Sequence, residues 1–173
     1  MTYRERLNDG EVLSLYAAGR RDFSFTSIVV GYWTGKDLSG INLSGTDLGC
    51  GIVSNANLSE SYLVGAKFNC VDINGANLRG SDLTNTRFSG NIDCSNVNFT
   101  KCCLENVVFT YADLRNSDFL GAYDAGGSIW IKCDLTGANG FEHMLAQSGG
   151  IGVWDCIYPN GVKSIGGHGS LFS

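Results

Sequence analysis

A large apolar residue recurs at every fifth position through most of this chain, and that period restricts the fold more than any other feature. The series begins at Phe23, runs unbroken to Phe88, resumes at Cys94 after a one-residue insertion near Asn91, and ends at Leu135. A second insertion lies near Ala122. A period of five fits neither the 3.6-residue repeat of an α-helix nor the two-residue alternation of a strand. It predicts a chain that turns a corner every five residues.

The positions around each apolar centre also repeat. A small residue stands two places before the centre, Asp or Asn stands one place before it, and Gly or Asn is common two places after it. Clean copies are Ala76-Asn-Leu-Arg-Gly80, Ser81-Asp-Leu-Thr-Asn85 and Ala112-Asp-Leu-Arg-Asn116. With this pattern, repeated over residues 20–140, the chain resembles the pentapeptide-repeat family.

The resemblance implies an all-β fold, a right-handed quadrilateral parallel β-helix with four pentapeptides in each coil. The apolar centres then point inward, and coils stack at the strand spacing of ~4.8 Å because no coil buries its own core. Aromatic residues should accumulate toward the C-terminal half. One interior column reads Ile28, Leu48, Phe68, Phe88, Phe109, Trp130.

The chain divides into three segments: residues 1–19, a predicted N-terminal helical cap; 20–140, the β-helix; and 141–173, a C-terminal cap. Caps are expected because an open coil exposes unpaired backbone. Thr2 and Glu5 have capping-box spacing at the start of the first segment. The stretch Leu15–Phe23 resembles the segment that precedes the first repeat in cyanobacterial family members.

The last segment contains two predicted elements of its own. Residues Phe141 to Gln147 are predicted to form a short helix, and Ile157 to Val162 a hairpin that turns at Pro159-Asn160-Gly161. This ending also resembles the common ending of the family.

The composition argues against several classes of function. The net charge is -5 and 17% of residues are charged, which argues against a basic groove for nucleic acid. The N-terminal residues contain no continuous apolar run, so neither a signal peptide nor a membrane span is predicted, and a cytoplasmic location is expected. No cysteine lies in a Cys-x-x-Cys pair, and neither His143 nor His168 has metal-ligand spacing to one. No cofactor is therefore predicted.

Four aspartates form the candidate partner-binding stripe. Each precedes an apolar centre of one column, so their side chains should point outward on consecutive coils. Such a ladder suits a cation or a basic partner, or mimics a run of nucleic-acid phosphates. The plainer interpretation is that Asp is favoured at this position, with Arg115 offsetting part of the charge. The four are Asp72, Asp93, Asp113 and Asp134.

Two cysteines and an apolar cluster are weaker candidates for a functional site. Cys50 and Cys70 are expected on the same corner of adjacent coils, where a disulfide is geometrically conceivable but reduced thiols are favoured in a cytosolic chain. An apolar patch is also expected on the outside of the last coils. It either binds a protein partner or is covered by the C-terminal tail, and the second interpretation is favoured. The patch is Val108, Ile129 and Ile131, and the tail residues are Val153, Trp154 and Ile157.

The sequence thus predicts a non-catalytic scaffold that presents rigid faces to a protein partner, as a monomer or as a homodimer through one end. The alternative is a DNA-mimicking inhibitor or protector of type II topoisomerase (gyrase), an activity of some acidic, rod-like family members. An enzyme is disfavoured because no nucleophile, base and orienting group can be assembled from the sequence. The fold itself does not decide among these functions.

Overall fold

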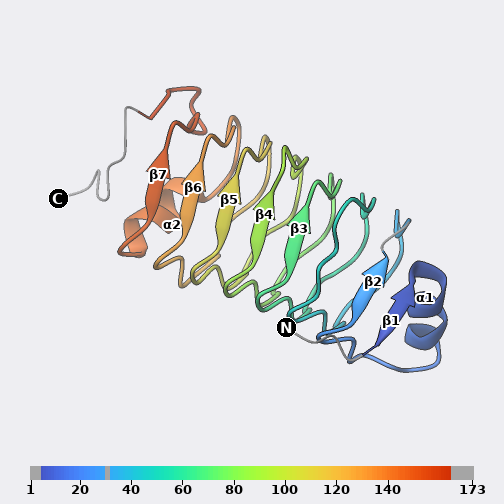
Figure 1. Cartoon of the computed structure of the whole chain (residues 1–173). Helices are drawn as coiled ribbons and strands as arrows, with labels where there is room; N and C mark the ends of the chain where they lie inside the picture. The colour runs from blue at the N-terminus through green and yellow to red at the C-terminus, as the bar shows by residue number, and fades with distance from the viewer. Residues whose placement is uncertain (1–4, 30–31, 165–173) are drawn as a thin grey trace.

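The computed structural model describes residues 5–29 and 32–164. The chain winds into a right-handed quadrilateral β-helix, which confirms the predicted fold class. Successive coils stack along one axis, with α1 (Asp9–Ala17) at the N-terminal end and α2 (Phe141–Gln147) near the other (Figure 1). No α-helix interrupts the coils between residues 38 and 88, as the five-residue period predicts.

Regular strands occupy one side of the β-helix. All strand pairs are parallel, and they form two sheets, one of β1-β2 and one of β3-β4-β5-β6-β7. On the other sides, single parallel bridges such as Asn77↔Asn98 join neighbouring coils. The strands are β1 (Arg6–Asn8), β2 (Ser27–Val29), β3 (Lys67–Asn69), β4 (Arg87–Ser89), β5 (Val108–Thr110), β6 (Ile129–Ile131) and β7 (Gly152–Trp154).

The corners are made by residues in the left-handed backbone region, where Gly and Asn are the least strained residues. Most of the corner residues with positive φ are Gly or Asn. Both predicted insertions are found at corners. Gly90 and Asn91 have φ values of 82° and 56° at the first, and Asp124 has a φ of 49° at the second. Each extra residue is accommodated in a turn, so the interior pattern continues on either side.

The apolar centres form one continuous core, and Cys94 is fully buried among them. Ring stacking begins at Phe68 and runs through Phe88 and Phe109 to Trp130, with centroid separations of 4.9, 4.5 and 4.5 Å. A second stack, Phe99 on Phe119, packs edge-on against the first. The C-terminal half therefore carries an aromatic core, as the column pattern predicts.

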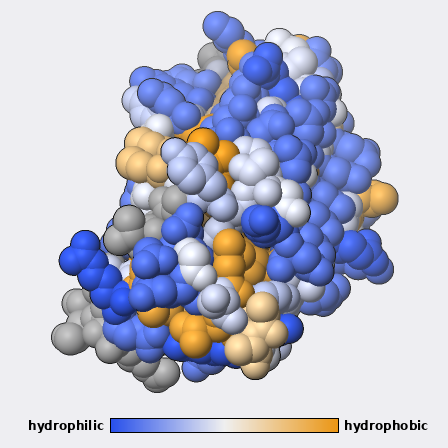
Figure 2. Space-filling view, turned by 90° about the vertical axis from the view of Figure 1, so that its right-hand side faces the viewer, coloured by the Kyte–Doolittle hydropathy of each residue, from blue (hydrophilic) through white to orange (hydrophobic). Residues whose placement is uncertain are grey.

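The N-terminal segment differs from the predicted helix. Residues 6–8 form β1, and the helix begins only at Asp9, after the cap residue Asn8. A capping box joins Asn8 and Glu11; the predicted box of Thr2 and Glu5 involves Thr2, which lies outside the described residues. A strand is favoured here because Leu7 pairs with Ile28 and extends the interior column by one residue. Viewed from this end, hydrophobic residues lie among hydrophilic ones (Figure 2).

The C-terminal segment contains the predicted helix, α2, over the same residues. The predicted turn is also present, since the Tyr158 N–H donates to the Val162 carbonyl and Ile157 forms an antiparallel bridge with Lys163. For Val153, Trp154 and Ile157, the expectation that the tail folds back over the outer apolar patch is wrong. Strand β7 instead adds to the edge of β6, because pairing the open backbone edge satisfies its hydrogen-bonding groups.

In strand β7, the side chain of Val153 points into the core, and Trp154 lies on the outside beside Ile131. The half-buried side chains of Val108, Ile129 and Ile131 therefore remain on the outer surface.

Candidate functional site

The four aspartates of the predicted stripe lie in one row across consecutive coils. Parallel bridges link Asp72 to Asp93, Asp93 to Asp113 and Asp113 to Asp134, and Ile157 follows at the C-terminal end of the row. All four side chains are half-buried. We call this side of the β-helix the acidic face. Its carboxylates are held at the coil spacing by the backbone, so their separation does not depend on flexible loops.

Each carboxylate of the row caps its own corner. One oxygen, Oδ1, accepts a hydrogen bond from the backbone N–H two residues later, which is an Asx-type turn. Asn57 and Asn77 make the same contact on another side of the coils, at 3.2 and 3.1 Å. The distances within the row are 2.9 Å for Asp72, 2.9 Å for Asp93, 3.1 Å for Asp113 and 3.0 Å for Asp134. The aspartates therefore have a structural role, whatever they bind.

Sequence reasoning missed this capping role, although a signal was present. Two residues after the Asp stands a hydroxyl residue in two of the four cases. The hydroxyls of Ser95 and Thr136 each donate to Oδ1 of their own aspartate at 2.6 Å. The spacing Asp-x-Ser or Asp-x-Thr therefore marks the turn. In the part of the chain that the structure describes, the hydrogen bonds to Asp72, Asp93 and Asp134 all reach Oδ1, so Oδ2 keeps acceptor capacity.

Asp113 has a different environment. Arg115 donates from Nε to Oδ1 at 2.8 Å and from Nη2 to Oδ2 at 2.5 Å, in a forked ion pair. The hydrogen bonds from the Arg115 guanidinium hold the pKa of the Asp113 carboxyl below its usual value. The expected charge offset by Arg115 is thus concentrated on one member of the row.

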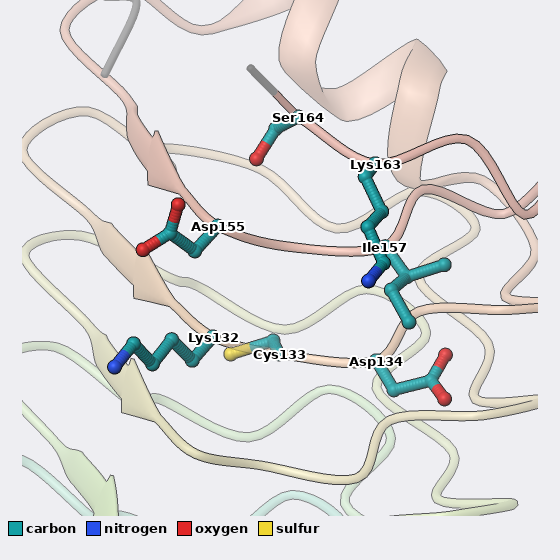
Figure 3. Close-up of a pocket in the computed structure, with 7 residues that line it drawn as sticks. All are labelled: Lys132, Cys133, Asp134, Asp155, Ile157, Lys163 and Ser164. Atoms are coloured by element: carbon teal, nitrogen blue, oxygen red, sulfur yellow. The ribbon is translucent and has the colours of Figure 1, made fainter. Parts of the chain in front are cut away.

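A pocket of about 400 Å³ lies beside the C-terminal end of the row (Figure 3). Asp134 and Lys163 lie on one side of it, and Asp155 and Lys132 on the other. Two carboxylates and two ammonium groups balance, so the lining favours neither an anion nor a cation. The remaining lining residues are Cys133, Ile157 and Ser164.

Cys133, which lines this pocket, lies next to Cys156. The Cys133 N–H approaches the Cys156 sulfur at 3.3 Å, and both residues are buried. The hydrogen bond between the two thiols lowers the pKa of Cys156 and raises that of Cys133. Burial raises the pKa of Cys102 to about 12. Over residues 5–29 and 32–164, no group of three or more His, Cys, Asp and Glu side chains has the arrangement of a metal site.

The other predicted candidates lie apart from the acidic row. Cys50 and Cys70 are exposed free thiols with φ values of 60° and 55°, at equivalent corners of adjacent coils. His143 lies exposed on α2, with Nε2 2.9 Å from the side-chain nitrogen of Gln147. His168 lies outside the described residues. No helix in the described part of the chain is long and apolar enough to cross a bilayer.

Comparison with known proteins now agrees with this geometry. The model of pentapeptide repeats matches in eight copies, over residues 37–69, 54–90 and 92–123. The chain belongs to the pentapeptide-repeat family. Among solved pentapeptide-repeat proteins, one from the thylakoid lumen of Arabidopsis thaliana is 23% identical. That match covers 77% of this chain and 83% of the other, with a TM-score of 0.50.

QnrB1, a plasmid-mediated fluoroquinolone resistance protein, is 20% identical, with a TM-score of 0.51. The match covers 78% of this chain and 69% of QnrB1. No curated protein sequence matches the chain significantly. At these identities the two structures establish the pentapeptide-repeat fold, and the function is argued from the residues.

Proposed function

We propose that this pentapeptide-repeat protein is a non-catalytic, cytoplasmic scaffold that presents rigid faces of its β-helix to a protein partner. The observation that carries the proposal is the row of carboxylates on the acidic face, fixed in register by backbone bridges and by their own turns. A rigid backbone loses little conformational entropy on binding, so a modest number of contacts suffices for recognition.

The acidic row is the proposed contact line for a partner with spaced Lys or Arg side chains. Four carboxylates on successive coils span three coil spacings, about 14 Å. The attraction weakens as salt rises, over a Debye length of ~8–10 Å. The remaining acceptor capacity of Asp72, Asp93 and Asp134 lets them bind a basic partner without giving up their turns.

The experiment replaces all four aspartates of the row with asparagine. Asparagine keeps the turn, because Asn57 and Asn77 already cap equivalent corners. Proteins captured from the native host by the parent and by the variant are compared by mass spectrometry at low and at high salt. We expect the variant to lose the salt-sensitive partners. The matched control changes Asp37, Asp82 and Asp118, which cap other corners, to Asn. Equal loss in the control would contradict a specific role for the row.

The same preparation tests the proposed assembly, a monomer or a homodimer through an end of the β-helix. Light scattering over a concentration series gives the mass. A larger assembly would contradict this part of the proposal.

A second candidate is inhibition or protection of type II topoisomerase. The acidic row favours it, because evenly spaced carboxylates resemble phosphates, and the fold is shared with the resistance protein QnrB1. The net charge of -5 is modest for a DNA mimic. A gyrase supercoiling assay, with and without a fluoroquinolone, decides between the candidates. A dose-dependent effect that the quadruple Asn variant loses supports the second candidate. If the protein has no effect at any dose, the topoisomerase function is excluded and the scaffold function is retained.

A further inference from the structure

The side of the β-helix that carries β3 to β7 has a composition unlike the rest of the surface. Figure 1 shows these strands side by side along the molecule. Their outward positions include no Asp or Glu, in a chain with 17 acidic residues and a net charge of -5. We call this side the sheet face. Its outward residues are Lys67, Asn69, Arg87, Ser89, Val108, Thr110, Ile129, Ile131, Gly152 and Trp154.

The strand register sorts the sheet face into a basic end and an apolar end. Lys67 pairs with Arg87 at the β3–β4 end, and Val108 pairs with Ile129 on the following strands. In the neighbouring row, Ile131 pairs with Trp154. Five strands at ~4.8 Å give a surface about 19 Å long, which changes from cationic to apolar along its length.

Trp154 gives the apolar end a specific shape. A Cβ atom added at Gly152 would overlap Cη2 of the Trp154 indole, so the ring lies directly across the Gly152 backbone. Gly152 is not among the residues with positive φ, so no turn requires glycine there. Glycine within a strand weakens it and often marks close approach of another group. Here that group is the indole, which is 36% exposed and forms a flat outer surface.

The basic end has no evident role in holding the fold. The side chains of Lys67 and Arg87 are exposed, and within the described residues neither forms an ion pair. Asp47 precedes Lys67 in the same row and offsets part of its charge, but its Oδ1 accepts from the Gly49 N–H. Like charges directly opposite on paired strands are destabilising. The two cations are therefore available to a ligand of opposite charge.

We propose that the sheet face binds a protein segment that carries carboxylates at one end and apolar side chains at the other. The carboxylates meet Lys67 and Arg87, and the apolar side chains pack on Ile131 and Trp154. This inference rests on the proposed scaffold function and names a second face and the chemistry of its partner. Tryptophan and arginine are enriched among residues that dominate binding energy. A surface of about 19 Å matches roughly 13 residues of helix at 1.5 Å per residue.

A membrane surface is the other class of ligand that tryptophan and cations suit. It is disfavoured because two cations near an anionic bilayer contribute only about 1 kcal/mol each. The apolar side chains of Val108, Ile129 and Ile131 are also half-buried between neighbouring rungs and do not protrude. Binding to anionic vesicles is therefore an outcome that the test has to distinguish.

The probe is a displayed library of random 16-residue peptides, selected on the parent protein. We expect enriched peptides to combine Asp or Glu with Leu, Phe or Trp. One enriched peptide, fluorescently labelled, is then titrated by polarisation. The double variant Lys67→Ser, Arg87→Ser should weaken its binding at least tenfold and remove most of the salt dependence. Trp154→Ala should also weaken it at least tenfold, and Ile131→Ser provides a second variant at the apolar end.

The matched control is Arg79→Ser with Lys101→Ser, which removes two exposed cations from another side and should change the affinity less than twofold. Circular dichroism establishes that each variant is folded. No enriched peptide, enriched peptides without acids, or an affinity indifferent to Lys67 and Arg87 would each overturn the proposal. So would sedimentation with phosphatidylserine–phosphatidylcholine vesicles that depends on the same residues.

The two proposals fail separately. If the parent protein captures no native partner, the scaffold function fails whatever the peptides show. If native partners are captured but the sheet-face variants keep all of them and the peptide, only the inference about this face fails.

Discussion

The acidic face and the sheet face are neighbouring sides of the same coils, yet their outward side chains are held in opposite ways. On the acidic face each Asp is hydrogen-bonded to its own backbone, as with Asp93 and the Ser95 N–H at 2.9 Å. On the sheet face, outward side chains such as Val108 and Ile129 have no capping role, because the strands pair through their backbones. The same coil thus uses side chains to hold one side and backbone pairing to hold the other.

This difference changes how the two compositions should be interpreted. Where the turn requires Asp or Asn, a row of aspartates is partly explained by the fold, and its bearing on binding has to be tested against asparagine. Where strand pairing holds the coil, the fold leaves the outward residue nearly free. A change from Lys67 and Arg87 to Ile131 and Trp154 is then more informative about a partner.

The largest difference in stability is expected between substitutions in the core beneath the two faces. Phe109, under the sheet face, stacks between Phe88 and Trp130 with centroids 4.5 Å away on each side. Phe109→Ala should lower the free energy of unfolding by about 3–5 kcal/mol, because it leaves a cavity and removes both ring contacts. Leu114→Ala, under the acidic face, should cost less, about 2–3 kcal/mol. Urea denaturation at pH 7 measures both, and a larger loss for Leu114 would reverse the comparison.

A smaller effect is expected from removing one turn cap on the acidic face. Asp93→Ala loses the hydrogen bonds from the Ser95 N–H and hydroxyl, and should cost about 1 kcal/mol. Asp93→Asn should cost less than half as much, because the amide oxygen still accepts. Thermal unfolding of the two variants provides the measurement. Equal losses would show that the charge, and not the turn, is what matters at this corner.

The pH dependence of stability gives a finer test of the acidic face. The folded-state pKa of Asp113 is lowered by the Arg115 hydrogen bonds, from a reference value of 3.8. Its contribution is therefore present above about pH 4 and is lost as pH falls through the lower folded-state value. Arg115→Ala should be less stable than the parent at pH 7, and the difference in stability should shrink as pH falls below about 4. A difference that does not change with pH would show that the effect comes from packing and not from the Asp113 charge.

The sequence predicted most of this architecture because the five-residue period reports directly on which side chains face inward. The spacing marks Cys94 as an inward-facing residue, and it places the four aspartates in one row when combined with the four pentapeptides per coil that the family resemblance implies. Strand β1 could not be predicted in this way, since Leu7 is separated from its partner Ile28 by a helix that breaks the period.

Strand β7 was missed for a related reason. Helix α2 inserts extra residues into the last coil, so Trp154 pairs with Ile131 outside the expected spacing. The residues of the sheet face can be assigned only from that register, because it shows which residues of β7 lie beside β6. The turn-capping role of the aspartates depends on hydrogen bonds within each corner, about which the five-residue period carries no information.

The smallest effect on stability is expected for the double variant Lys67→Ser, Arg87→Ser on the sheet face. The two cations are directly opposite each other on β3 and β4, and within the described residues neither has an ion pair. The double variant relieves the repulsion between the two cations but also loses the attraction between Lys67 and Asp47, so the free energy of unfolding should stay within about 0.5 kcal/mol of the parent. Melting curves at low and at high salt measure this, and any difference should shrink as salt screens both interactions. Arg115→Ser on the acidic face is the matched control, because it removes a paired cation and should lower stability. A loss of more than about 1 kcal/mol from the double variant would show that Lys67 and Arg87 support the fold, and the sheet face would then be constrained by structure as the acidic face is.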